Sequence, residues 1–158
     1  MIHLLFICHG NICRSPMAEA IMKELVRRKG LTGRFLITSL AATAEEIGHD
    51  IYPPAKEMLT RKGIPFKKRK ARLMTDADYD WADRILIMDE ENRRDVNRLS
   101  GGDKAHKVSL LLSWAGEDRE VADPWYTGDF EKTYEDLRKG CEALLEALEP
   151  LLSGPAAE

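Results

Sequence analysis

The sequence contains no apolar run long enough for a helix that spans a membrane. Its opening apolar segment, residues 2–7, is short and is followed by no cleavage site, so we expect neither a signal peptide nor membrane association. Only three cysteines are present, without a Cys-x-x-Cys pair or a His/Cys cluster that would indicate a metal. We therefore expect a cytoplasmic protein with reduced thiols, no metal and no cofactor.

An excess of positive charge is also missing. The net charge of −3 provides no basic field for nucleic acid, so we expect no nucleic-acid partner. Internal repeats and low-complexity segments are absent apart from a short Gly-Pro-Ala-Ala-Glu end. The length fits one domain with a full hydrophobic core. We expect that domain to cover residues 1–152, followed by a short flexible tail over residues 153–158.

What the sequence does contain is one short loop, Cys8 to Ser15, between a predicted strand and a predicted helix. The apolar residues 2–7 are too few for a helix and suit a buried strand. Ser15 suits a helix N-cap, and Pro16 suits the first helical turn. The loop therefore runs from the carboxyl end of a strand to the amino end of a helix. Unpaired N–H groups and the helix dipole make that position an anion site.

The residue types of this loop indicate phosphate chemistry. Gly10 lets the backbone turn its N–H groups inward around an anion. Arg14 offers a planar fork of donors that matches two phosphate oxygens. The same donors favour the thiolate form of Cys8, which is then a nucleophile aimed at phosphorus. A nucleotide-binding P-loop is excluded because the Gly-Lys-Ser/Thr ending is missing.

A second group of interest, Asp123-Pro124-Trp125-Tyr126, lies in a predicted loop near the carboxyl end of the chain. Cleavage of an aryl phosphate requires a proton for the leaving oxygen, and an Asp–Pro pair presents a carboxyl group rigidly. Trp125 and Tyr126 would then form a wall for an aromatic substrate. The alternative is an ordinary Asp–Pro turn, but the loop at Cys8 favours Asp123 as a general acid.

Strands and helices alternate along the rest of the chain. Strands are predicted at residues 35–39, 84–88 and 108–112, and helices at residues 16–29, 53–63, 75–81, 90–99 and 130–148. This order predicts an α/β fold with a four-stranded parallel sheet and helices on both faces. Ligands of such sheets bind at the carboxyl ends of the strands, where Cys8 lies. Cys141 falls on the apolar face of the last helix and is expected to be a buried, inert thiol.

Between Cys8 and Pro16 the sequence closely resembles the low-molecular-weight protein tyrosine phosphatases. Their pattern Cys-x-Gly-Asn-x-Cys-Arg-Ser-Pro is matched at every fixed position, and the resemblance extends to the Asp123 group near the other end. It implies one phosphatase domain in which Cys8 forms a phosphocysteine, Arg14 binds phosphate, and Asp123 acts as acid and then as base. The implied substrate is a phosphotyrosine protein or a small aryl phosphate, with inorganic phosphate as the product.

The remaining loop residues have expected roles as well. Ser15 can donate its hydroxyl to the Cys8 sulfur when that sulfur is the leaving group, and Asn11 can hold an unusual backbone conformation. Cys13 resembles the family's second loop cysteine, which traps an oxidised nucleophile as a disulfide, although simple packing is an equal alternative. The expected substrate-binding residues are His9, Gly10, Asn11, Ile12, Cys13, Glu45, Trp125 and Tyr126.

Two positions depart from the family pattern. When Ser39 and Gly48 are aligned with it, Glu45 stands where the family usually carries an aromatic wall residue. Glu45 would add negative charge to the substrate slot, unless it pairs outward with the basic run at residues 67–72. The family also often has a histidine before its Ala-Arg pair that ties down the loop. Lys68-Arg69-Lys70 stands there instead, so the sequence does not show whether the contacts that fix the loop are kept. We expect the basic run at residues 67–72 to be a solvated surface loop.

Three other functions are less well supported. Thiol arsenate reductases share the loop but need two further cysteines close together, whereas Cys141 stands alone downstream. Phosphoarginine phosphatases share the loop but carry a threonine at the position that corresponds to Ile12. The isoleucine at this position therefore favours phosphotyrosine as the substrate. A phosphoprotein-binding module without catalysis would not need the combination of Cys8, Arg14 and Asp123.

Overall fold

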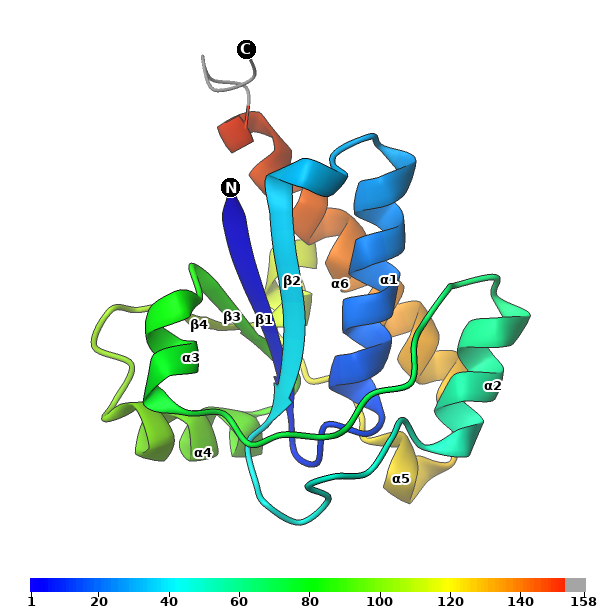
Figure 1. The fold of residues 1–158 in the computed structure, drawn as a ribbon, viewed down its shortest axis with the longest axis horizontal. Coiled ribbons are helices and arrows are strands. Elements are labelled where there is room, and N and C mark those ends of the chain that lie inside the picture. Colours follow the sequence, from blue (N-terminus) through cyan, green and yellow to red (C-terminus); the bar gives the residue numbers. More distant parts are fainter. Residues whose placement is uncertain (153–158) are drawn as a thin grey trace.

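The protein is described here by a computed structural model, which covers residues 1–152; the predicted tail at residues 153–158 lies outside the described residues. Four parallel strands form one sheet (Figure 1). They are β1 (Ile2–Cys8), β2 (Phe35–Ala41), β3 (Arg84–Ile87) and β4 (Val108–Leu110). The predicted four-stranded parallel sheet is therefore confirmed.

The order of the strands in the sheet is β2-β1-β3-β4. The chain moves from β1 to one side for β2 and then returns to the other side for β3 and β4. The boundary between β1 and β3 is thus the point where the direction of winding changes, and sheets of this type bind ligands there. The loop after β1 begins at that boundary.

Six α-helices and three short 3-10 helices are found in the described part of the chain. They are α1 (Arg14–Arg28), α2 (Pro53–Arg61), α3 (Asp76–Trp81), α4 (Glu90–Ser100), α5 (Pro124–Thr127), α6 (Phe130–Leu148), η1 (Thr32–Arg34), η2 (Leu111–Ala115) and η3 (Glu149–Leu152). A capping box starts α3, since Thr75 and Asp78 each accept a hydrogen bond from the other's backbone N–H.

Two predicted boundaries are wrong for identifiable reasons. Ser15 is not the N-cap of α1, because the helix already starts at Arg14 and the Ser15 hydroxyl is occupied by the loop. The fourth strand ends at Leu110 instead of residue 112, because the Ser113 hydroxyl donates to the Leu110 carbonyl at 2.6 Å and the chain turns into η2.

Helices cover both faces of the sheet, as expected from the alternation of elements. On one face, Leu4 and Phe6 of β1 pack with α1 and α6 in the larger hydrophobic cluster. On the other face, Leu5 and Ile7 pack with α3 and α4 in a second cluster. Figure 1 shows α1 and α6 on one side of the strands and α3 and α4 on the other. None of the helices in residues 1–152 is long and apolar enough to cross a membrane.

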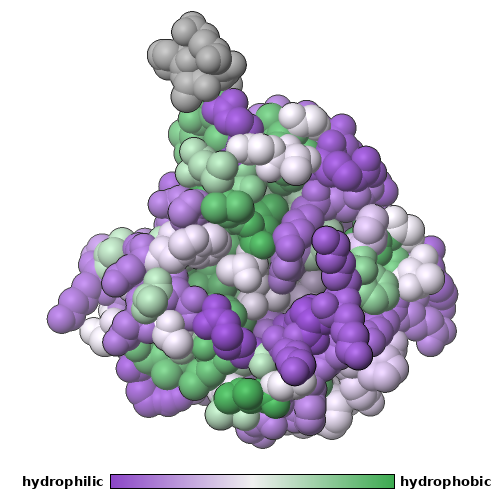
Figure 2. Space-filling model, viewed as in Figure 1, coloured by the Kyte–Doolittle hydropathy of each residue, from purple (hydrophilic) through white to green (hydrophobic). Residues whose placement is uncertain are grey.

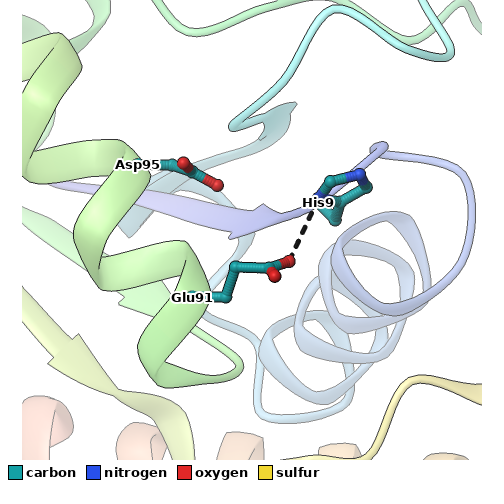
Figure 3. A group of neighbouring side chains, drawn as sticks. All are labelled: His9, Glu91 and Asp95. Atoms are coloured by element: carbon teal, nitrogen blue, oxygen red, sulfur yellow. Dashed lines mark ion pairs between the residues drawn. The ribbon is translucent and has the colours of Figure 1, made fainter.

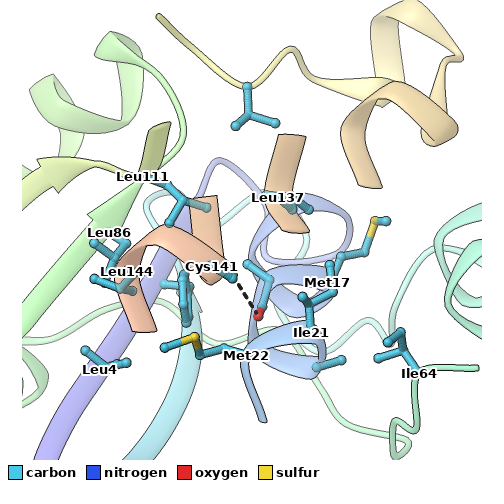
Figure 4. Close-up of a cluster of buried hydrophobic side chains, with 14 of the residues drawn as sticks. Leu4, Met17, Ile21, Met22, Ile64, Leu86, Leu111, Leu137, Cys141 and Leu144 are labelled. Atoms are coloured by element: carbon cyan, nitrogen blue, oxygen red, sulfur yellow. Dashed lines mark hydrogen bonds between the residues drawn. The ribbon is translucent and has the colours of Figure 1, made fainter. Parts of the chain in front are cut away.

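Cys141 lies in the larger cluster (Figure 4). Its side chain is fully buried, and its sulfur donates to the Ala18 carbonyl at 3.7 Å, which ties α6 to α1. Burial raises the pKa of this thiol far above its ordinary value. The prediction that this thiol is buried is confirmed; its inertness stays a prediction.

Candidate active site

The loop after β1 brings Cys8 and Arg14 to the carboxyl edge of the sheet. Cys8 is the last residue of β1, and Arg14 is the first residue of α1, so a strand and a helix fix both ends of the loop. The left-handed conformation within it falls on Asn11, with φ of 60°, and not on Gly10. Gly10 instead allows close approach, because a Cβ there would lie 3.0 Å from the Glu46 side chain.

Asn11 holds the loop together through its side chain, which is fully buried. Its amide nitrogen donates to the hydroxyl oxygens of Ser15 at 2.8 Å and Ser39 at 3.1 Å. Its amide oxygen accepts from the Arg69 guanidinium and from the Arg72 backbone N–H. These bonds from three separate segments stabilise a backbone conformation that is unfavourable for a residue other than glycine.

Arg69 supplies a contact that fixes the Cys8–Arg14 loop, which the sequence analysis could not assign. It is half-buried, and its guanidinium donates to Asn11 from the Lys68-Arg69-Lys70 segment, which stands where the family often has a histidine. Burial lowers the pKa of Arg69, while the negative charges of Glu19, Cys8 and Asp50 oppose that shift. The expectation of a solvated loop therefore fails at this residue.

The lysines beside Arg69 agree with the expectation of a solvated loop. Lys67, Lys68 and Lys70 are exposed. In Figure 2, hydrophilic side chains gather where the segment before Arg72 passes in front of α1.

We predict that Arg69→Ala lowers kcat roughly tenfold or more, because a loop that relaxes by a fraction of an ångström no longer aligns the nucleophile. Lys68→Ala, an exposed neighbour, is the matched control and should retain full kcat. Arg69→His should recover most of the lost rate, since histidine can donate to the same amide oxygen. Equal kcat for Arg69→Ala and the control would show that Arg69 does not position the loop.

Ser15 lies within hydrogen-bond distance of Cys8. Its hydroxyl oxygen is 3.1 Å from the Cys8 sulfur and also accepts a hydrogen bond from Asn11. Because that oxygen already accepts, its own proton is free to be donated to sulfur.

The second loop cysteine, Cys13, is buried, and its pKa is raised by burial and by the charge of Cys8, so it stays a neutral thiol. Capture of oxidised Cys8 by Cys13 stays a prediction.

Arg14 is buried, and three acceptors hold its guanidinium in place. One terminal nitrogen donates to the Asp89 carboxylate at 2.6 Å and to the Val121 carbonyl at 2.9 Å. The other lies 3.4 Å from the Asp123 carboxylate. Burial lowers the pKa of Arg14, but the charges of Cys8, Asp89 and Asp123 outweigh burial and raise it overall. Arg14 is thus a fixed cation close to Cys8.

Asp89 was missed by the sequence analysis, although its position held a signal. It follows β3 at the same edge of the sheet as Cys8, and it caps α4 by accepting from the Asn92 backbone N–H at 2.8 Å. A capping aspartate is normally assigned to the helix alone. Its second oxygen is the one that holds Arg14.

Asp123 and the two aromatic residues stand opposite the loop. Asp123 caps the short helix α5 by accepting from the Trp125 backbone N–H at 3.0 Å, and its side chain is 23% exposed. The Trp125 ring contacts the ring of Tyr52, with centroids 4.8 Å apart. Tyr52 in turn donates its backbone N–H to the Ile12 carbonyl at 2.8 Å. The sequence analysis missed Tyr52, which connects the aromatic wall to the loop.

A cavity of about 140 Å³ separates the loop from this wall. It is lined by Cys8, His9, Gly10, Ile12, Cys13, Arg14, Glu45, Glu46, Asp123, Trp125 and Tyr126. Nearly all of the predicted site residues therefore meet in one place; Asn11 and Ser15 are fully buried and support the loop instead.

Glu45 lines this cavity, although its side chain remains 64% exposed. Its carboxylate pairs with the His9 ring at the mouth, so outward pairing with the basic run is wrong. Glu46, its neighbour, also lines the cavity and was not predicted. The side chain of His9 is 31% exposed, as expected for a residue on the rim.

One group of possible metal ligands occurs in the described residues, formed by His9, Glu91 and Asp95 (Figure 3). Their ligand atoms lie within 4.8 Å of one another. Each side chain already has a charged neighbour, because His9 lies 3.3 Å from Glu91 and Asp95 lies 3.2 Å from Arg98. Charge pairing accounts for this cluster, and we assign it no metal.

A parallel α/β fold that carries a Cys-x5-Arg loop between its first strand and a helix is typical of cysteine-based phosphatases. The chain belongs to the low molecular weight phosphotyrosine protein phosphatase family, whose family model matches residues 3–151.

Named relatives agree with this assignment. The chain is 39% identical to the low molecular weight protein-tyrosine-phosphatase YfkJ of Bacillus subtilis, with 94% of this chain and 97% of that protein covered. It is 36% identical to the human low molecular weight phosphotyrosine protein phosphatase, with 90% and 93% covered.

Solved structures show the same fold. The crystal structure of YfkJ superposes with a TM-score of 0.90 at 38% identity, and the match covers 95% of this chain and 96% of that one. A structure of a Drosophila arginine phosphatase also matches, with a TM-score of 0.84 at 27% identity over 94% of this chain and 98% of that one.

Proposed function

We propose that this protein hydrolyses phosphotyrosine, in proteins or as small aryl phosphates, through a phosphocysteine on Cys8. The observation that carries the proposal is the arrangement of three groups around one cavity. The Cys8 sulfur lies beside the Ser15 hydroxyl, the buried Arg14 guanidinium is fixed by Asp89, and the Asp123 carboxylate lies 3.4 Å from Arg14. Nucleophile, anion ligand and proton donor thus surround the space that a phosphate would occupy.

The first step forms the phosphocysteine. Arg14 and the loop N–H groups bind the phosphate oxygens and stabilise the charge that spreads over them in the transition state. The Cys8 thiolate attacks phosphorus as the bond from phosphorus to the phenolic oxygen breaks. The Asp123 carboxyl gives its proton to that oxygen, so the leaving group departs as a neutral phenol.

The second step releases inorganic phosphate. The Asp123 carboxylate takes a proton from water, and the water oxygen attacks phosphorus as the bond to sulfur breaks. The sulfur leaves as a thiolate, which the Ser15 hydroxyl stabilises by a hydrogen bond. Asp123 is then protonated again, and the enzyme is ready for the next substrate.

The aromatic wall supports an aryl substrate. Trp125 is 53% exposed and Tyr126 is 82% exposed, yet Trp125 is held at one edge by Tyr52. Exposed aromatic rings beside a phosphate site can stack on a tyrosine ring. Ile12 lines the same cavity and favours phosphotyrosine over phosphoarginine. We place the protein in the cytoplasm, where a thiol nucleophile stays reduced, and its three cysteines are free thiols.

We predict that Asp123→Asn slows hydrolysis of phenyl phosphate roughly 10²- to 10⁴-fold, the range of a general acid. The loss should be much smaller for para-nitrophenyl phosphate, because nitrophenolate departs without a proton. The measurement is kcat for a series of aryl phosphates whose leaving groups differ in pKa. Asp118→Asn, an exposed neighbour, is the control. An equal loss across the series would remove Asp123 from the acid role.

The proposed function itself is tested by comparing phosphotyrosine, phosphoserine and phosphoarginine peptides of one sequence. We expect turnover of the phosphotyrosine peptide with release of inorganic phosphate. Faster turnover of the phosphoarginine peptide would favour the activity named for the Drosophila structure. Binding of all three peptides without phosphate release would identify a phosphoprotein-binding module.

A further inference from the structure

The mouth of the active site is surrounded by four carboxylates. Glu45 and Glu46 follow β2, and Glu91 and Asp95 project from α4 toward His9 (Figure 3). Their side chains are 64%, 32%, 58% and 21% exposed, respectively. We call these four residues the acidic rim. Two of them, Glu45 and Glu46, line the cavity directly.

The negative charge of the acidic rim is only partly balanced. Within residues 1–152, Asp95 alone pairs with an arginine, Arg98, at 3.2 Å. Glu45 and Glu91 both pair with His9, which carries at most one positive charge between them.

Glu46, the remaining member of the acidic rim, is also paired with a histidine. Glu46 pairs only with the exposed His49, at 2.9 Å. Arg94, on α4 between Glu91 and Asp95, is exposed and forms no ion pair with any rim residue in the described structure. A net negative charge therefore faces incoming substrate.

An acidic mouth is unexpected for an enzyme whose substrate carries a phosphate dianion. The phosphate itself is bound deeper, by the buried Arg14 and the loop N–H groups. The rim lies farther out, beside the residues that flank the phosphotyrosine. Like charges there repel an acidic flanking residue, whereas a lysine or arginine gains attraction. The exposed rings of Trp125 and Tyr126 on the other wall also suit a cationic side chain.

We propose that the acidic rim selects phosphotyrosine segments that carry lysine or arginine next to the phosphotyrosine. The inference rests on the proposed phosphatase activity and names the substrate class of that same site. The basic flank supplies the charge that the rim lacks, while the phosphate, the tyrosine ring and Asp123 keep the roles already described. The rim changes which peptide is captured and leaves the chemical step alone.

The test compares three phosphotyrosine peptides of equal length whose flanking residues are lysine, alanine or glutamate. The wild-type enzyme should give the highest kcat/KM for the lysine peptide and the lowest for the glutamate peptide. Added salt should reduce the difference, since Glu45 and Glu91 are largely exposed to solvent. In Glu45→Gln/Glu91→Gln the ratio between the lysine and glutamate peptides should fall by roughly threefold or more.

Glu135→Gln/Glu146→Gln, which removes the same two charges at exposed positions of α6, is the control and should keep the wild-type ratio. A wild-type ratio near one, or an unchanged ratio in the double variant, would overturn the inference. If the double variant does not fold, the salt dependence of the wild-type ratio decides in its place. Failure of the enzyme to hydrolyse any peptide or para-nitrophenyl phosphate would instead refute the phosphatase activity.

Discussion

Cys8→Ser should lower kcat for aryl phosphates by roughly 10⁴-fold or more, the scale of losing a covalent nucleophile. A serine hydroxyl among these donors has no adjacent base to take its proton, and a hydroxyl is in general a far weaker acid and a weaker nucleophile than a thiol. Phosphate binding should persist, because Arg14 and the loop N–H groups are unchanged. The measurements are single-turnover kinetics of para-nitrophenyl phosphate and competition by inorganic phosphate.

Cys141→Ala is the control for removal of a thiol. That residue is buried between α6 and α1, so the variant loses some stability but should keep its kcat. Wild-type-like activity of Cys8→Ser in a preparation free of wild-type enzyme would contradict the phosphocysteine mechanism. Trapping a covalent phosphoenzyme by acid quench in the wild type, and its absence in Cys8→Ser, gives an independent readout.

Arg14→Lys should reduce kcat/KM by roughly 10²- to 10³-fold, as for loss of an aligned donor to a charged transition state. The guanidinium contacts Asp89, Val121 and Asp123 at once, and an ammonium group cannot reproduce that planar fork. The Asp89 carboxylate would then lose its 2.6 Å hydrogen bond from the Arg14 guanidinium.

The expected loss at Arg14 should appear in both kcat and the inhibition constant of phosphate. Arg98→Lys, an exposed arginine of α4, is the matched control and should be neutral. A loss of less than about tenfold would show that positive charge, rather than the fork geometry, is what the site requires. Thermal unfolding of each variant separates this effect from general destabilisation.

Features that depend on contiguous residues were predictable from the sequence. The loop from Cys8 to Arg14 lies between a strand and a helix because apolar periodicity changes there, and its donors are set by residue type. The capping box at Thr75 and the apolar face of α6 follow the same logic. Neighbours within one or two turns of chain decide these features, so local chemistry was sufficient.

The boundaries that failed were those decided by contacts outside the segment. Ser15 has the residue type of an N-cap, but its hydroxyl is bound by Cys8 and Asn11 within the folded loop. Leu111 and Leu112 read as strand, yet they are buried in the larger cluster beside α6, and the chain turns into η2. At both places tertiary contacts outweighed the local preference of the residues for a helix cap or a strand.

The sequence alone predicted a thiol nucleophile, a phosphate-binding arginine and a remote Asp–Pro acid in one chain. Only the tertiary structure decided what holds them. Asp89 reaches Arg14 across 75 positions of chain because the strand order places β3 beside β1. Arg69 reaches Asn11 across 58 positions by the same folding of distant segments against the loop. Such side-chain pairs have no local pattern, because their distance is set by how the sheet and its loops pack and not by spacing along the chain.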